Sequence, residues 1–232
     1  MFRAYWEEEI RQAQDRERIF TIEKIIEPLR KDWPNIAAEL QEAVKKNTQY
    51  MGESFFLIGD ALYKAKKNDE AMRAFERAIN LKSEISGVYA PLSDIYRSQG
   101  RFADAIASAK KGIEINPGDG NLYVSLAWYY SLADKYNEAV TAGKEAIKLA
   151  PEQAMAHTNL CRAYNDIREY ELAIQTCNQA LKLNPDDGET EFYLGRAYDF
   201  LKRSEMATQY YKKSVIGLEN FTRDNPEYSD GF

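Results

Sequence analysis

Apolar and small residues recur along most of the chain at a fixed interval of 34 positions. The pattern is clearest in residues 154–187, where leucines, tyrosines, alanines and a proline occupy characteristic places. The same classes of residue return 34 positions earlier and later. Self-similarity at this interval is typical of arrays of helical hairpins. We therefore predict five consecutive repeats, at 52–85, 86–119, 120–153, 154–187 and 188–221.

Each unit holds two amphipathic segments, with small residues where the two predicted helices would cross. Gly59 and Ala78 mark such positions in the first unit, because helix axes approach to about 8–10 Å only where side chains are small. Tyr130, Tyr164 and Tyr198 recur at one repeat position. We expect these rings to fill the space between one hairpin and the next.

This pattern resembles the tetratricopeptide repeat (TPR), a pair of antiparallel helices with small residues at their crossing. The resemblance extends over residues 52–221. It implies an all-α protein, an α-solenoid wound as a right-handed superhelix. In the fourth unit it rests on Leu160, Cys161, Tyr164, Tyr170, Ala173, Cys177, Ala180, Leu183 and Pro185.

The two ends of the chain depart from the repeat. We interpret residues 1–51, with a predicted helix from Pro34, as an N-terminal helical cap or degenerate repeat; a separate partner-binding or self-association arm is the alternative. Glu219 stands where proline would stop the last helix, which is expected to continue to about Phe221. Residues 222–232 are expected to form a flexible C-terminal tail.

Composition and charge narrow the range of partners. Acidic residues outnumber basic ones, the formal net charge is −6, and no basic block stands out. Nucleic acid is therefore not an expected partner. No apolar run approaches the ~20 residues that cross a bilayer, so membrane insertion is not expected either.

Glu7, Glu8 and Glu9 interrupt any secretory signal, and this predicts a cytoplasmic protein. The alternative is a periplasmic or membrane-associated location after removal of a leader or anchor.

The two cysteines of the chain, Cys161 and Cys177, fall on opposite helices of the fourth unit at inward positions. The favoured interpretation is that both are reduced thiols acting as small apolar side chains. The alternative is a disulfide, which would require an oxidising compartment. No spacing of cysteine and histidine indicates a metal site, and no cofactor is expected.

Catalytic residues are sparse. The single histidine, His157, lies one helical turn before Cys161, and no third orienting group follows from the sequence. We interpret His157 as a packing or helix-start residue and predict that the protein is not an enzyme.

The TPR resemblance also implies a binding surface, because the first helices of successive units line a concave groove in that family. The lysine and asparagine positions of the family's carboxylate clamp hold Phe56 and Asp60, or Ala90 and Asp94, so that clamp is absent. The predicted groove residues are Phe56, Asp60, Tyr63, Asp94, Arg97, Trp128, Arg162, Asn165, Phe192, Arg196 and Asp199.

Two arginines of this set have two interpretations. Arg162 and Arg196 lie one unit apart, and their planar guanidinium groups would suit an acidic side chain or a free carboxyl terminus. They would equally pair within the protein, Arg162 with Asp166, and Arg196 with Asp199 or Asp166. Trp128 is expected either to contact a ligand or to pack on Arg162 or Arg97.

The sequence as a whole predicts a non-catalytic scaffold that binds a peptide or a segment of a partner protein in the groove. A self-assembling scaffold, joined through its N-terminal helices or its uncapped C-terminal end, is the alternative. An enzyme subunit that uses His157 and Cys161 ranks third.

Overall fold

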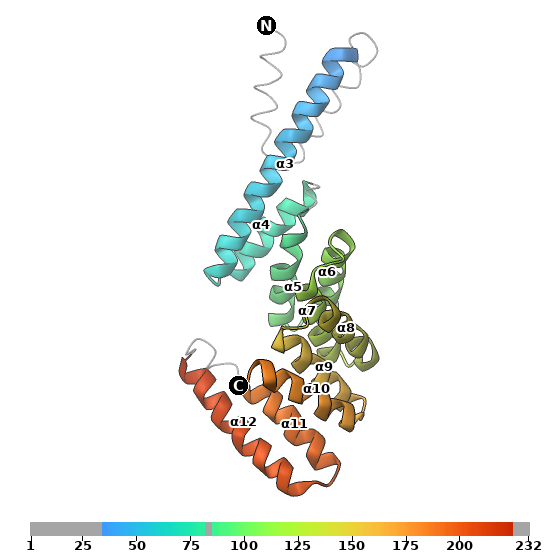
Figure 1. Cartoon of the computed structure of the whole chain (residues 1–232). Helices are drawn as coiled ribbons and strands as arrows, with labels where there is room; N and C mark the ends of the chain where they lie inside the picture. The colour runs from blue at the N-terminus through green and yellow to red at the C-terminus, as the bar shows by residue number, and fades with distance from the viewer. Residues whose placement is uncertain (1–33, 82–84, 225–232) are drawn as a thin grey trace. The chain divides into compact units, whose positions relative to one another are not determined.

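The computed structural model describes residues 34–81 and 85–224, all of whose regular elements are helices (Figure 1). The chain divides into two compact units, Met1–Ile95 and Tyr96–Phe232. The predictions for residues 1–33, and for the part of the C-terminal tail beyond 224, fall outside the described residues.

The first unit is built on one long helix. Helix α3 (Pro34–Lys64) is followed by α4 (Asn68–Asn80), the short 3-10 helix η1 (Ser86–Val88) and the start of α5 (Tyr89–Ser98). Helix α3 begins at Pro34 as expected, but it continues without a break through the predicted boundary between residues 51 and 52. The N-terminal region and the first helix of the first repeat therefore share one helix.

The second unit is a stack of helical hairpins. After α6 (Phe102–Ile115) come three pairs, which are α7 (Gly120–Leu132) with α8 (Tyr136–Leu149), α9 (Ala154–Asp166) with α10 (Tyr170–Leu183), and α11 (Gly188–Phe200) with α12 (Ser204–Asp224). Each second helix also packs on the next first helix, and α9 contacts both α7 and α11. The order of the elements in Figure 1, from green to red, follows this stacking.

The turns inside the hairpins carry the same 34-residue period as the helices. In each turn the amide of one residue donates to the carbonyl five positions earlier, as Lys135 N does to Tyr130 O at 2.8 Å. This closure needs a residue in the left-handed region just before the donor. The residues with positive φ are Lys66, Gly100, Asp134, Arg168 and Lys202.

Small residues at the helix crossings are required sterically, as predicted. A Cβ added to Gly59 would lie 2.6 Å from two ring carbons of Phe75, and one added to Gly195 would lie 2.8 Å from the ring of Tyr211. Ala78 is completely buried at its crossing. The rings of Tyr130 and Tyr164 are also buried, whereas Tyr198 is half-buried.

Helices α11 and α12 approach closely at Gly217, which occupies a position held by leucine or isoleucine in the other units. A Cβ on Gly217 would lie 2.8 Å from Gly188 Cα, and a Cβ on Gly188 would lie 2.6 Å from Leu218 N. Both obstacles are backbone atoms, so a side chain would force the two helices apart. Gly217 therefore lets α12 pass directly over the start of α11.

We expect Gly217→Ala to lower the free energy of unfolding by about 1–3 kcal/mol, the usual cost of overpacking. Gly118→Ala is the matched control, because its added Cβ has only Asn116 Oδ1 nearby, at 3.6 Å. Urea denaturation of the two variants measures the difference. Equal midpoints would show that α12 does not approach α11 in this way.

The last helix extends beyond the predicted end near Phe221 and reaches Asp224. Val215 and Ile216 of this helix are 55% and 58% exposed. Tyr210 instead stacks on Tyr198, with ring centroids 5.5 Å apart. Among the helices of residues 34–81 and 85–224, none is long and apolar enough to cross a membrane.

Candidate functional site: a ladder of arginines and aromatic rings

Four side chains alternate between guanidinium groups and aromatic rings across the first helices of the second unit. The guanidinium carbon of Arg97 lies 4.4 Å from the ring centroid of Trp128, and that of Arg162 lies 5.8 Å from the same ring. Arg162 is also 4.9 Å from the ring centroid of Tyr193. We call Arg97, Trp128, Arg162 and Tyr193 the arginine–aromatic ladder. Cation–π contacts of this kind fix the rings and the cations against each other.

Arg162 lies at the centre of this ladder and is 9% exposed. Its Nη2 donates to the carboxylate of Glu189, and its Nε donates to the hydroxyl of Tyr193. The internal pairing that the sequence left open therefore exists, but the partner is Glu189 on α11 and not Asp166 on the same helix. A buried guanidinium that is paired in this way positions neighbouring helices.

Arg196 forms the second internal pair. Its Nη1 lies 3.0 Å from Asp166 Oδ1, one of the two partners that the sequence suggested. Burial raises the pKa of Asp166 above its ordinary value, and the nearby charge of Arg196 opposes this rise. The guanidinium also lies 5.9 Å from the ring centroid of Phe200, which stacks on Tyr170.

Two buried oxygen atoms beside the ladder have no hydrogen-bond partner among the described residues. They are Ser131 Oγ and Asn165 Oδ1, which occupy the same repeat position in successive units. The Asn165 amide donates to the carbonyl oxygens of Cys161 at 3.1 Å and Tyr193 at 3.2 Å, and these contacts fix its orientation. Unsatisfied acceptors in a protein interior are rare, so these atoms are candidates for contact with a bound group.

A polar seam joins α9 to α11 beneath this surface. The hydroxyl groups of Thr158 and Thr190 lie 2.7 Å apart, and both contact the carboxylate of Asp187, which also caps the start of α11. Thr190, Glu189 and Tyr193 were not predicted from the sequence. Each of them lies close to one repeat length further along the chain than its partner on α9. Residues at that separation fall on neighbouring first helices, and this is the sequence signal that could have identified them.

Four of the predicted groove residues belong to the first unit. Tyr63 donates its hydroxyl to Asp94 Oδ2, 2.5 Å away, so these two residues are brought together. Asp60 forms an ion pair with Lys64 at 2.6 Å, and Phe56 packs near Phe75 with ring centroids 6.4 Å apart. Each is therefore engaged by a neighbour in its own unit.

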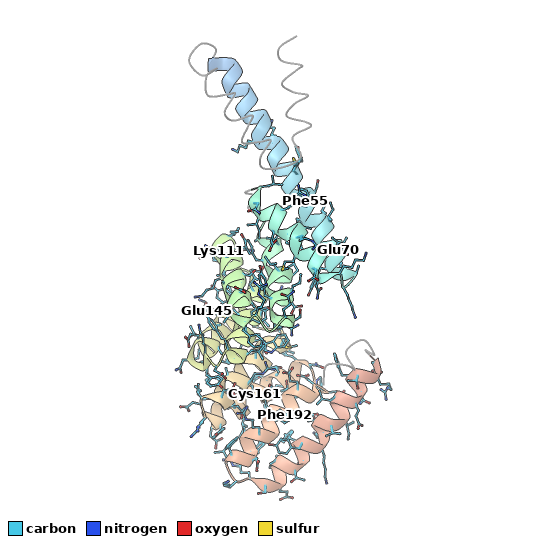
Figure 2. All side chains as sticks on the ribbon, turned by 180° about the vertical axis from the view of Figure 1, so that it is seen from behind. Phe55, Glu70, Lys111, Glu145, Cys161 and Phe192 are labelled. Atoms are coloured by element: carbon cyan, nitrogen blue, oxygen red, sulfur yellow. A yellow bond between two sulfur atoms is a disulfide. The ribbon has the colours of Figure 1, made fainter. Side chains whose placement is uncertain are left out.

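The remaining two predicted residues lie on α11. Phe192 is 44% exposed, although one edge of its ring meets Tyr193 at a centroid distance of 5.5 Å. Asp199 is exposed near the end of the same helix. Phe192, labelled in Figure 2, is the large apolar side chain of the predicted set that solvent reaches most easily.

The cysteines do not form the reactive site considered as the third hypothesis. Cys161 and Cys177 are joined by a disulfide between α9 and α10, with both side chains completely buried. The favoured interpretation of reduced thiols is therefore replaced by the disulfide alternative, because the two inward positions bring the Cα atoms to 5.3 Å. His157 Nε2 lies 2.8 Å from the Pro151 carbonyl oxygen. No grouping of metal-binding side chains occurs within 34–81 or 85–224.

Comparison with solved structures shows the fold. A crystal structure of MamA is 24% identical over 72% of this chain and 97% of its own, with a TM-score of 0.62. MamA 41-end from Desulfovibrio magneticus RS-1 is 15% identical over 73% of this chain and 96% of its own, with a TM-score of 0.65. YrrB, described as a TPR protein with an unusual peptide-binding site, is 14% identical over 70% of this chain and 84% of its own, with a TM-score of 0.61. A search of curated proteins found no match.

The hairpins, their crossings and their turns together define a helical-repeat protein. Models of the tetratricopeptide repeat match residues 52–85, 87–119, 120–153, 154–187 and 193–215. The chain therefore belongs to the tetratricopeptide repeat family, whose members are generally interaction scaffolds and not catalysts.

Proposed function

We propose that the protein is a non-catalytic scaffold that binds a segment of a partner protein on the first-helix surface of its second unit. The observation that carries this proposal is the arginine–aromatic ladder, which holds Trp128 and Tyr193 in fixed positions on neighbouring helices. Both rings are half-buried, so each retains an accessible part. Rigid aromatic side chains of this kind commonly dominate the binding energy of an interface.

The supporting observations concern the same surface. Phe192 adds an exposed ring next to Tyr193. Ser131 Oγ and Asn165 Oδ1 would accept hydrogen bonds from the main-chain amides of an extended segment once it displaced the side chains that cover them. Arg162 and Arg196 contribute mainly by ordering this surface, since both are already paired with carboxylates.

We expect Trp128→Ala to weaken the binding of such a segment by about tenfold or more, a typical loss for an aromatic anchor. The probes are peptides selected on the full chain from a random library displayed on phage, with affinities measured by fluorescence polarisation. Leu183→Ala is the control, because Leu183 is 38% exposed at the end of a second helix. Selected peptides that bind the two variants equally would refute the proposal.

Self-assembly is the second candidate, and the exposed apolar side chains of α12 favour it. Val215 and Ile216, which are 55% and 58% exposed, would be covered if α12 packed against another copy of the chain. Light scattering over a range of concentrations tests this, with Val215 and Ile216 changed to glutamate as the comparison. A mass that stays monomeric at every concentration would remove this candidate.

A further inference from the structure

A cleft lies within the third hairpin, between α7 and α8, and it includes none of the predicted groove residues. Its volume is about 310 Å³, near the lower end of the range for pockets that hold small ligands. The side chains around it come from these two helices alone. They are Tyr123, Leu126, Tyr130, Asn137, Glu138, Thr141, Ala142 and Glu145.

The two helices contribute different chemistry to this cleft. From α7 come Tyr123, Leu126 and Tyr130, which recur at helical spacing and form an apolar and aromatic wall. From α8 come the carboxylates of Glu138 and Glu145, two turns apart. Because paired helices run antiparallel, each end of the cleft holds one tyrosine and one glutamate.

The carboxylates retain the capacity to accept further hydrogen bonds. Glu138 is exposed and forms no ion pair with any of the described residues. Glu145 pairs with Lys148 at 2.9 Å, but its side chain is 42% exposed and the pair lies at the surface. Surface pairs of this kind contribute little and exchange readily, so the rim of the cleft is acidic and available to a cation.

The other repeats show what is unusual about the third hairpin. In the first hairpin the guanidinium carbon of Arg77 lies 4.8 Å from the ring centroid of Phe55, and these residues are the counterparts of Glu145 and Tyr123. Only the third unit has a carboxylate at this repeat position. Its counterparts in units one, two, four and five are Arg77, Lys111, Gln179 and Lys213. Figure 2 labels Phe55, Lys111 and Glu145.

We propose that the cleft between α7 and α8 binds an arginine side chain of a partner protein, with its guanidinium over a tyrosine ring and against Glu138 or Glu145. The incoming residue would make the contact that Arg77 makes within the first hairpin. The cleft is thus a second docking surface, separate from the arginine–aromatic ladder. It selects a basic segment, whereas the ladder presents rings.

Arginine fits this cleft better than lysine does. Its planar guanidinium stacks on an aromatic face and forms two parallel hydrogen bonds to a carboxylate, whereas an ammonium group is a compact and strongly hydrated charge. The apolar stem of the side chain would lie along Leu126 and Ala142, both of which are buried in the wall. Long basic side chains commonly cover apolar surface in this manner.

The experiment titrates the full chain with the capped peptide acetyl-Gly-Arg-Gly-amide and follows the methyl NMR signals of Leu126 and Ala142. A second peptide carries citrulline, which has nearly the shape of arginine without its charge. We expect saturable shifts of both methyl signals with the arginine peptide and none with the citrulline peptide. A lysine peptide should give smaller shifts at the same concentration.

Three variants test the assignment. Glu138→Gln combined with Glu145→Gln should weaken binding by about tenfold or more, and Glu145→Arg should abolish it by placing a guanidinium on Tyr123 from within the chain. Glu152→Gln, in the turn after α8, is the control for loss of a carboxylate and should bind as the unmodified protein does. Trp128→Ala should also leave the binding of the arginine peptide to the cleft unchanged. The test of the cleft therefore does not depend on whether the arginine–aromatic ladder binds a partner.

The opposite results would overturn the proposal. These are equal shifts with the citrulline peptide, shifts that map to residues around Trp128 in place of the cleft, or unchanged affinity in the double glutamine variant. Circular dichroism of each variant shows whether the helices are intact, and the Glu145→Arg variant provides the independent check if the double variant is destabilised.

Discussion

Replacing Arg162 with glutamate is expected to lower the free energy of unfolding by about 3 kcal/mol, the lower part of the range for breaking a buried ion pair. The substitution would place two carboxylates together, because Glu189 is the present partner of Arg162. It would also remove the cation between Trp128 and Tyr193. The lower part of the range applies because the Glu189 side chain is 36% exposed and remains partly hydrated. Urea denaturation followed by circular dichroism measures this effect.

Two further variants show whether the loss comes from charge at this position. Arg162→Met keeps much of the apolar stem and leaves Glu189 facing solvent, so it should cost less than Arg162→Glu. Lys212→Glu makes the same change of charge on the exposed side of α12 and should have little effect. If Arg162→Glu is as stable as Lys212→Glu, Arg162 does not hold α9 against α11.

Removal of the disulfide by changing both Cys161 and Cys177 to alanine is expected to lower the free energy of unfolding by about 3 kcal/mol, the value for a loop of about 15 residues. The bond closes a loop of 16 positions across the fourth hairpin. It also lies beside α11, because Cys177 Sγ of α10 lies 3.5 Å from the Thr190 carbonyl oxygen.

The redox state itself is measured by mass spectrometry of peptides from protein isolated with a thiol-blocking reagent. We expect one linked peptide containing both cysteines, and a denaturation midpoint that shifts with reductant in the unmodified protein but not in the alanine variant. Two blocked thiols in the isolated protein would contradict the disulfide. Since disulfides persist in oxidising compartments, the same measurement tests the predicted cytoplasmic location.

The repeating features of the fold could be read from the sequence because each contact recurs at a 34-residue interval. The crossing positions Gly59 and Ala78 and the packing rings Tyr130 and Tyr164 belong to this class, and all four lie where the pattern predicted. Local spacing was sufficient because these contacts join helices of one hairpin or of adjacent hairpins.

Other features could not be read from local spacing. The partner of Arg162 is Glu189, 27 positions away on α11, whereas the sequence suggested Asp166, one helical turn away on the same helix. Four of the five left-handed turn residues are not glycine, so composition gave no sign of their conformation. Gly217 was recognised as a departure from the repeat pattern, because leucine or isoleucine holds this position in the other units. That departure did not show that the backbones of Gly217 and Gly188 approach each other.

The proposal that the first-helix surface of the second unit binds a partner protein can be tested most directly by photo-crosslinking in the cells that produce the protein. The photoreactive residue p-benzoylphenylalanine would replace Phe192 beside the arginine–aromatic ladder, or Leu183 at the end of α10 as the comparison. Both sites are exposed to a similar degree, 44% and 38%. The proposed scaffold predicts a discrete adduct with a partner protein from position 192 and none from position 183. Adducts of equal yield from both positions, or none from position 192, would contradict it.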